Sequence, residues 1–136
     1  RGTPATMQNN TDYVDLIGEV YSFLKERIER ARQAGVAQWG IDPGLGFSKT
    51  VVGNFLLLKH MWHFANLGCP LLVGASRKSF IWKTLGKTAD EALEGSLALA
   101  VLSRAAGAHI LRVHDVQASC RALRVADAVL QAEVES

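Results

Sequence analysis

The alternation of helical patterns with short strand-like runs constrains the fold of this chain more than any other feature. Apolar residues recur at the three- and four-residue steps of one helix face over 13–28, 54–65 and 88–106, and again after Asp115. Short apolar runs typical of strands lie between these segments, at 39–41, 71–73 and 109–115. Parallel strands are joined by right-handed helical crossovers, so this order predicts an α/β fold with three parallel strands. Residues 1–136 show no internal domain boundary and are expected to form a single segment.

The ends of the predicted helices carry capping signals. Thr11 is expected to cap the first helix, and Gly35 is expected to end it. Thr88 and Glu91 match the Thr-x-x-Glu pattern of a capping box, which predicts a helix that begins there and ends at Gly107. The inner face of this helix is expected to carry Leu93, Leu97, Ala100 and Val101. The inner face of the last helix is expected to carry Leu123, Ala126, Val129 and Leu130.

The charge of the chain argues against an extended electrostatic binding surface. Its 15 basic and 13 acidic residues are mixed along the sequence and leave a net charge of +2. Neither nucleic acid nor a membrane is therefore an expected partner, and any anion site must be local. Cys69 and Cys120 fit no metal-binding spacing, and two free thiols are typical of a reducing compartment such as the cytoplasm.

Polar side chains follow each of the three predicted strands. Asp42 follows the first strand, the cluster 76–79 (Ser-Arg-Lys-Ser) follows the second, and Arg112 and His114 close the third. In parallel α/β folds the carboxyl ends of the strands meet at one edge, where binding sites are built. We therefore expect these side chains to gather in one site.

The segment 71–79, Leu-Leu-Val-Gly-Ala-Ser-Arg-Lys-Ser, predicts a buried strand that breaks at Gly74 and leads into a polar site. A helix that begins near Ser79 would direct its free N–H groups at this cluster, where backbone, hydroxyls and cations together can hold an anion. An ordinary serine cap beside two solvated cations is the alternative interpretation.

Arg112 and His114 lie two residues apart on an extended segment, so their side chains point to the same side. The guanidinium fork matches a phosphate group, and histidine can donate a hydrogen bond and carry part of a charge. The pair therefore suits a diphosphate. In the alternative interpretation Arg112 pairs with Asp115, and His114 caps the following helix.

Asp42 offers two adjacent acceptors, which match a flat heterocycle that presents an amino group beside a ring N–H. Pterins and guanines have such an edge, and Phe47 could cover a bound ring. In the alternative interpretation the Asp-Pro-Gly sequence at 42–44 is a turn in which Asp42 bonds to its own backbone, and Phe47 is a core residue.

Spacing excludes several other kinds of site. Gly44 and Gly46 lack the third glycine of a dinucleotide-binding fingerprint, and no Gly-x-x-x-x-Gly-Lys sequence occurs. Ser76 lacks the Gly-x-Ser-x-Gly elbow of a hydrolase. His60 and His63 have no obvious third ligand, so no metal site is expected in this chain.

Three motifs in order, separated by helices, resemble the C-terminal half of dihydropteroate synthase. They are Ile41-Asp-Pro-Gly-Leu-Gly-Phe47, Leu71-Leu-Val-Gly-Ala-Ser-Arg-Lys-Ser79 and Leu111-Arg-Val-His-Asp115. Residues 1–8, Arg-Gly-Thr-Pro-Ala-Thr-Met-Gln, are similar to the loop that precedes this half. The resemblance covers essentially the whole chain and implies a partial TIM (β/α)8 barrel, its C-terminal three strands with their helices.

The resemblance implies a transferase of folate biosynthesis. Such an enzyme condenses 4-aminobenzoate with (7,8-dihydropterin-6-yl)methyl diphosphate to give 7,8-dihydropteroate and diphosphate. It implies that Asp42 and Lys78 bind the pterin and that Arg112 and His114 hold the diphosphate, with Lys78, Arg112 and His114 as catalytic residues. The substrate pocket is further expected to include Gly46, Phe47, Gly74, Ser76 and Ser79.

The resemblance also sets expectations for the whole enzyme. The asparagine that binds Mg²⁺ belongs to the first half of the barrel, so the chain is expected to be a fragment that is inactive alone. The full-length protein is expected to be a cytoplasmic homodimer, or to lie in an organellar matrix in a eukaryote, and to be a sulfonamide target. Two alternatives stay open: a pterin-binding barrel of the methyltransferase type, and a non-catalytic fragment or interaction module.

Overall fold

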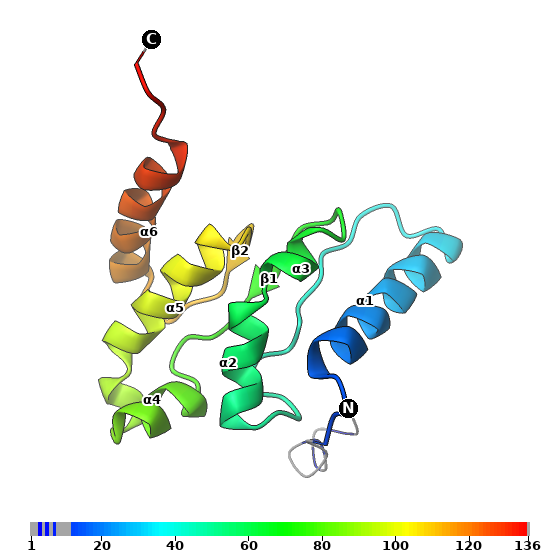
Figure 1. The fold of residues 1–136 in the computed structure, drawn as a ribbon, viewed down its shortest axis with the longest axis horizontal. Helices are drawn as coiled ribbons and strands as arrows, with labels where there is room; N and C mark the ends of the chain where they lie inside the picture. Colours follow the sequence, from blue (N-terminus) through cyan, green and yellow to red (C-terminus); the bar gives the residue numbers. More distant parts are fainter. Residues whose placement is uncertain (1–2, 4, 6, 8–11, 136) are drawn as a thin grey trace.

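The structure is a computed structural model that describes residues 3, 5, 7 and 12–135. Figure 1 shows the order of its elements. They are α1 (Leu16–Gln33), α2 (Val51–Lys59), α3 (Trp62–Ala65), β1 (Leu72–Val73), α4 (Ser79–Leu85), the 3₁₀ helix η2 (Ala89–Glu91), α5 (Leu93–Ala105), β2 (Ile110–Leu111) and α6 (Val116–Gln131). Helix and strand are mixed, as predicted, with much more helix than strand.

The strand segments run parallel, as predicted. β1 pairs with β2 so that Leu72 lies opposite Ile110. On its other side β1 is extended by a parallel bridge between Ile41 and Leu71. The strand predicted for 109–115 is shorter than expected. After β2 the ladder continues only with the hydrogen bond from Arg112 N to Val73 O, 3.1 Å long, before the chain turns into α6.

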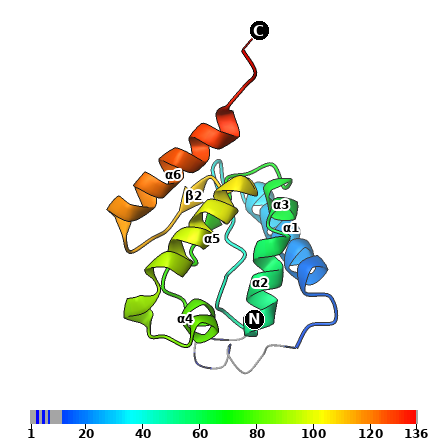
Figure 2. The same ribbon diagram turned by 60° about the vertical axis from the view of Figure 1, so that its left-hand side comes forward.

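The helices stand in a row over these strands. Figures 1 and 2 show α5 beside α6, and α2 between α5 and α1, which agrees with the packing of these pairs. Among the described residues no helix is long and apolar enough to span a membrane. The largest fully buried side chains include Leu45, Leu57, Met61, Phe64, Leu71, Val73 and Phe80. Leu45 and Phe80 directly adjoin the predicted site residues Gly46 and Ser79, so the core anchors both loops of the predicted site.

The first helix begins later than predicted. Asp15 is its cap and accepts a hydrogen bond from Gly18 N at 3.1 Å. Glu19 completes a reciprocal cap, since its Oε1 accepts from Val14 N at 3.1 Å. Thr11, the predicted cap, lies outside the described residues. The predicted end is confirmed, because α1 stops at Gln33 and Gly35 has a positive φ.

The helix predicted for 54–65 is divided into α2 and α3. α2 starts at Val51, where Thr50 Oγ1 accepts a hydrogen bond from Gly53 N at 3.0 Å. The start was not predictable from propensity, because the β-branched Val51 and Val52 are poor helix formers.

The capping box predicted at Thr88 does not start a long helix. Thr88 Oγ1 reaches Glu91 Oε1 at 3.3 Å, but only the short η2 follows, and α5 starts at Leu93. The buried residues of α5 are Ser96, Leu99, Ala100 and Ser103. Of the predicted inner positions, Ala100 is confirmed and the exposed Leu93 is wrong, while Leu97 and Val101 are half-buried. Ser96 faces inward because its Oγ accepts a hydrogen bond from Arg77 N at 3.0 Å.

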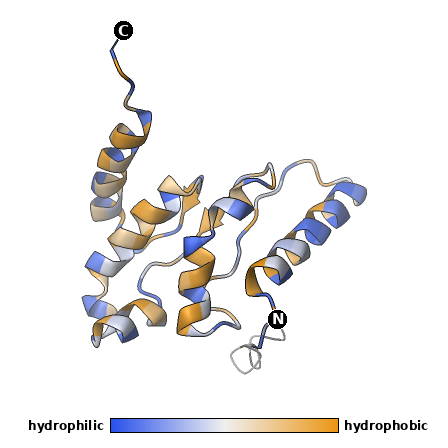
Figure 3. Cartoon of the chain, in the orientation of Figure 1, coloured by the Kyte–Doolittle hydropathy of each residue, from blue (hydrophilic) through white to orange (hydrophobic). Residues whose placement is uncertain are grey.

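The inner face predicted for α6 is largely exposed. Val129 and Leu130 are 72% and 49% exposed, and Figure 3 shows apolar residues along this helix. Ser119 is its one buried residue within the described chain. The prediction failed because α6 packs mainly on α5, which covers only one strip of it.

Candidate functional site

The structure brings the predicted site residues together in three loops that leave the strand segments at the same end. The contacts of Lys78 demonstrate this. Its Nζ donates to Leu45 O at 2.6 Å and lies 4.2 Å from the centre of the Phe47 ring. Burial lowers the pKa of Lys78, the positive charge of Arg112 lowers it further, and the carboxylate of Asp42 opposes this effect. Side chains from all three loops therefore influence the pKa or the contacts of one ammonium group, that of Lys78.

The first loop, 42–49, is tightly turned. Asp42 Oδ1 accepts a hydrogen bond from Gly44 N at 2.9 Å, so the self-bonded turn considered from the sequence is present. The Asp42 side chain is nevertheless exposed and sits at the rim. Gly46 has a φ of +83°, which favours glycine. A Cβ on Gly46 would lie 2.9 Å from Lys78 Cδ, so the absence of a side chain at Gly46 also leaves space for the Lys78 side chain.

Two residues that sequence reasoning missed hold this loop in place. Lys49 Nζ donates to Gly44 O and to Phe47 O, both at 2.8 Å. Asn54, on α2 and only 3% exposed, accepts from Gly46 N at 2.6 Å and donates to Thr50 O at 2.9 Å. The available signal was a polar side chain at a buried position of a helix, which requires hydrogen-bond partners.

The second loop, 74–78, connects β1 to α4. Helix α4 begins at Ser79, as predicted. Arg77 has a φ of +55° and Ser48 of the first loop a φ of +53°, and in the described chain no other residue except glycine has a positive φ. Such conformations cost about 1–3 kcal/mol each and cluster at functional sites.

The third loop, 112–115, packs against the second. A Cβ on Gly74 would lie 2.6 Å from Arg112 Nη2, so the guanidinium rests directly on the Gly74 backbone. Asp115 accepts from Arg77 Nη2 at 2.8 Å, which replaces the Arg112–Asp115 pair considered from the sequence. Hydrogen bonding to Arg77 lowers the pKa of the Asp115 carboxyl. His114 does not cap α6 either; its Nδ1 lies 2.9 Å from Ser76 Oγ.

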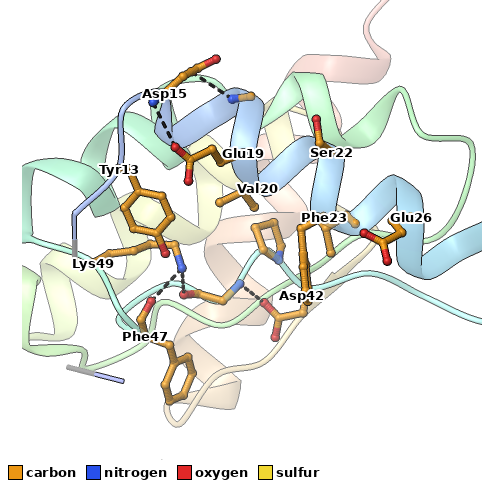
Figure 4. Close-up of a pocket in the computed structure, with 14 residues that line it drawn as sticks. Tyr13, Asp15, Glu19, Val20, Ser22, Phe23, Glu26, Asp42, Phe47 and Lys49 are labelled. Carbon is orange, nitrogen blue, oxygen red and sulfur yellow. Dashed lines mark hydrogen bonds between the residues drawn. The ribbon is translucent and has the colours of Figure 1, made fainter. Parts of the chain in front are cut away.

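A hollow of about 730 Å³ opens between α1 and the first loop. Asp42, Phe47 and Lys49 of the first loop line it together with Tyr13 and with Glu19 of α1 (Figure 4). Lys78 and Arg112 are not among its lining residues, so among the three loops this hollow adjoins only the first, at Asp42. Within the described residues, no three His, Cys, Asp or Glu side chains lie close enough to hold a metal ion.

The position of Lys49 predicts a pH dependence of stability. Burial lowers its pKa from 10.5 to about 8, against the opposing charge of Asp42. At a pH between these two pKa values, Lys49 is protonated in the unfolded chain and has lost its proton in the folded chain. The free energy of unfolding should therefore rise with pH across this range. Urea unfolding of the intact protein across this window should show the rise, and Lys49→Met should reduce it. Lys59→Met, at the end of α2, is the matched control. An undiminished rise in Lys49→Met would contradict the assignment.

Comparisons with known proteins agree with this geometry. Residues 1–114 match the family model described as pterin binding enzyme. The dihydropteroate synthase of Escherichia coli K12 is 44% identical over 135 residues, which are 98% of this chain and 48% of that protein. The structure of dihydropteroate synthase from Thermus thermophilus in complex with 6HMPPP superposes with a TM-score of 0.90 at 40% identity, over 94% of this chain and 51% of that one.

The same Thermus enzyme in complex with 4-aminobenzoate also superposes with a TM-score of 0.90 at 40% identity, over 94% of this chain and 53% of that one. The chain spans about half the length of the curated relatives that it matches.

Proposed function

The chain belongs to the pterin binding enzyme family, and we propose that it forms the C-terminal half of a dihydropteroate synthase. In this proposal residues 1–136 supply the last three strands of a (β/α)8 barrel with their helices. The parallel order of Ile41, β1 and β2 supports it. The observation that carries the proposal is the contact between the three loops: Lys78 contacts Leu45 and Phe47 of the first loop, and Arg112 of the third packs on Gly74 of the second.

The pterin ring is proposed to bind at the Asp42 end. The exposed carboxylate would accept from the amino group and the adjacent ring N–H, while Lys78 donates to the oxo and ring-nitrogen side. Lys78 Nζ is already oriented toward an acceptor, Leu45 O, which supports a donor role. The lowered pKa of Lys78 makes its ammonium a stronger acid and hence a better hydrogen-bond donor.

The diphosphate is proposed to bind at the other end, on Arg112 and His114. Gly74 contributes by leaving space for the guanidinium, and Ser76 contributes through its contact with His114. In the reaction a C–N bond forms between 4-aminobenzoate and the pterin methylene carbon, and the C–O bond to diphosphate breaks. Arg112 and His114 stabilise the electron pair that leaves with the diphosphate, and the amine proton passes to solvent.

The aminobenzoate is proposed to lie beside Gly46, Phe47 and Ser79. Phe47 is exposed, and its ring is free to stack on a second ring from the face opposite Lys78. The backbone at the start of α4 carries N–H groups that suit the benzoate carboxylate, with Ser79 as its first residue.

The remaining expectations apply to the whole enzyme. The protein ligand of Mg²⁺ is proposed to lie outside this chain, whose described residues hold no cluster of three His, Cys, Asp or Glu side chains. The full-length protein is proposed to be a cytoplasmic homodimer that binds the pterin diphosphate and 4-aminobenzoate and does not bind nucleic acid.

Binding measurements on the intact protein that contains this chain test the proposal. The pterin diphosphate should bind more tightly than the same pterin bearing a hydroxymethyl group, and diphosphate should be released on addition of 4-aminobenzoate. Equal affinity for the two pterins would refute the diphosphate site and favour the methyltransferase-type alternative.

Asp42→Asn should impair pterin recognition selectively. An amide presents one acceptor oxygen where the proposed ligand needs two, so the affinity for a pterin fragment should fall by roughly 5- to 150-fold. The affinity for inorganic diphosphate, measured by calorimetry in parallel, should not change. Asp12→Asn, another exposed aspartate, is the control substitution. Unchanged pterin affinity in Asp42→Asn would remove Asp42 from the proposed site.

A further inference from the structure

Ser76 and His114 form a double polar contact between the second and third loops. Ser76 is 8% exposed and directly precedes Arg77, while His114 lies 38 residues further along the chain. Ser76 Oγ lies 2.9 Å from His114 Nδ1 and accepts from the backbone N–H of His114 at 3.2 Å. One hydroxyl group therefore contacts both the ring and the backbone of the same histidine.

Counting donors and acceptors decides which way the ring contact runs. A serine hydroxyl has one hydrogen to donate and two lone pairs. The His114 backbone N–H can only donate, so it occupies one lone pair. Within the described residues Ser76 Oγ makes no other hydrogen bond, so its own hydrogen has the ring nitrogen Nδ1 as its acceptor.

The opposite tautomer would leave a buried donor without a partner. If Nδ1 carried the ring proton, it would donate to the second lone pair of Ser76, and the hydroxyl hydrogen would face no acceptor. A buried donor that loses its partner disfavours that state by roughly 5- to 150-fold. Asp115, the nearest carboxylate in sequence, accepts from Arg77 at 2.8 and 3.3 Å, and within the described residues it makes no hydrogen bond to the His114 ring.

We propose that Ser76 is a positioning residue that holds neutral His114 as the tautomer protonated on Nε2. The ring then presents an N–H donor, rather than a lone pair, on the side away from Ser76. This inference rests on the proposed function, in which the ring faces the departing diphosphate. A lone pair there would repel the anion, whereas an N–H stabilises it.

The tautomer can be read directly by long-range ¹H–¹⁵N correlation spectra of the intact protein labelled at histidine. The spectra are recorded in alkaline buffer, where imidazole is neutral, and His114→Gln assigns the signal. The wild type should show the Nε2-protonated form in at least roughly fivefold excess. A predominance of the Nδ1-protonated form in the wild type would overturn the inference, whether or not any variant folds.

Three substitutions sharpen the test. Ser76→Ala should give a mixture of both tautomers, and Ser76→Thr, which keeps the hydroxyl, should restore the wild-type spectrum. Ser103→Ala is the matched control, because Ser103 is 1% exposed and its Oγ has no hydrogen-bond partner. A Ser76→Ala spectrum identical to that of the wild type would also overturn the inference.

Kinetics separate this inference from the proposed function. Ser76→Ala should raise KM for the pterin diphosphate by roughly 5- to 10-fold, which corresponds to the loss of about one hydrogen bond. KM for 4-aminobenzoate should stay unchanged. If the tautomer responds as predicted while both KM values stay unchanged, the inference about Ser76 holds, and the proposed contact between His114 and diphosphate is refuted.

Discussion

Arg112→Ala is expected to weaken binding of the pterin diphosphate by about 1.5–3 kcal/mol, roughly a 10- to 150-fold loss of affinity. The reason is that the guanidinium makes charge-assisted hydrogen bonds to phosphate oxygens in the proposed complex. The Arg112 side chain is exposed and takes no part in the core, so the melting temperature should change little. Calorimetric titration with the pterin diphosphate and with inorganic diphosphate measures the effect.

Two further variants show whether the position of Arg112, and not charge alone, matters. Gly74→Ala keeps the arginine but places a Cβ 2.6 Å from its Nη2, so the flexible guanidinium must move away. It should therefore reproduce much of the loss seen in Arg112→Ala. Arg124→Ala removes an exposed arginine from α6 and should leave affinity unchanged. If Arg112→Ala binds inorganic diphosphate like the wild type, Arg112 does not belong to the site.

Asn54→Leu is expected to lower the free energy of unfolding by about 1–3 kcal/mol and to raise KM for 4-aminobenzoate. The substitution is close in size, but it removes the 2.6 Å acceptor of Gly46 N and the 2.9 Å donor to Thr50 O from a buried position. Gly46 and Phe47 should then lose their fixed position beside the proposed aminobenzoate pocket. Urea unfolding and steady-state kinetics of the intact protein measure the two effects.

The matched variants isolate the hydrogen bond to Gly46. Asn54→Asp keeps an acceptor for Gly46 N, so KM for 4-aminobenzoate should rise less than in Asn54→Leu, although stability should fall because a buried carboxylate oxygen then faces Thr50 O. Asn66→Leu changes an exposed asparagine, and its effect on unfolding should stay within about 0.5 kcal/mol. An Asn54→Leu variant as stable as the wild type would show that Asn54 does not hold the loop.

The gathering of the site residues could be predicted from the sequence because one rule of parallel sheets fixes it. Asp42, Lys78 and Arg112 each follow a strand segment, and the carboxyl ends of parallel strands lie at one edge. In the structure the loops that carry these residues touch, since Lys78 contacts Leu45 and Phe47 and Arg112 packs on Gly74. Their functional roles remain predictions.

The partners within the site were not predictable, because they depend on tertiary contacts between residues far apart in sequence. Arg112 belongs to the third loop and Arg77 to the second, and the sequence offered no reason for Asp115 to pair with Arg77 instead of Arg112. Lys49 was missed because a lysine in a loop is usually solvated, whereas this one donates to two carbonyls of its own loop.

The bond between Lys78 and Leu45 prepares the ammonium group for a ligand. The ammonium lies between the Leu45 carbonyl and the Phe47 ring, so part of its hydration shell has already been removed during folding. An ammonium group has three hydrogens to donate and Leu45 O accepts one of them, so an oxo group in the proposed complex would bind another hydrogen while Leu45 keeps its bond. Ligand entry would then remove less water from the cation, and the 42–49 turn would stay closed.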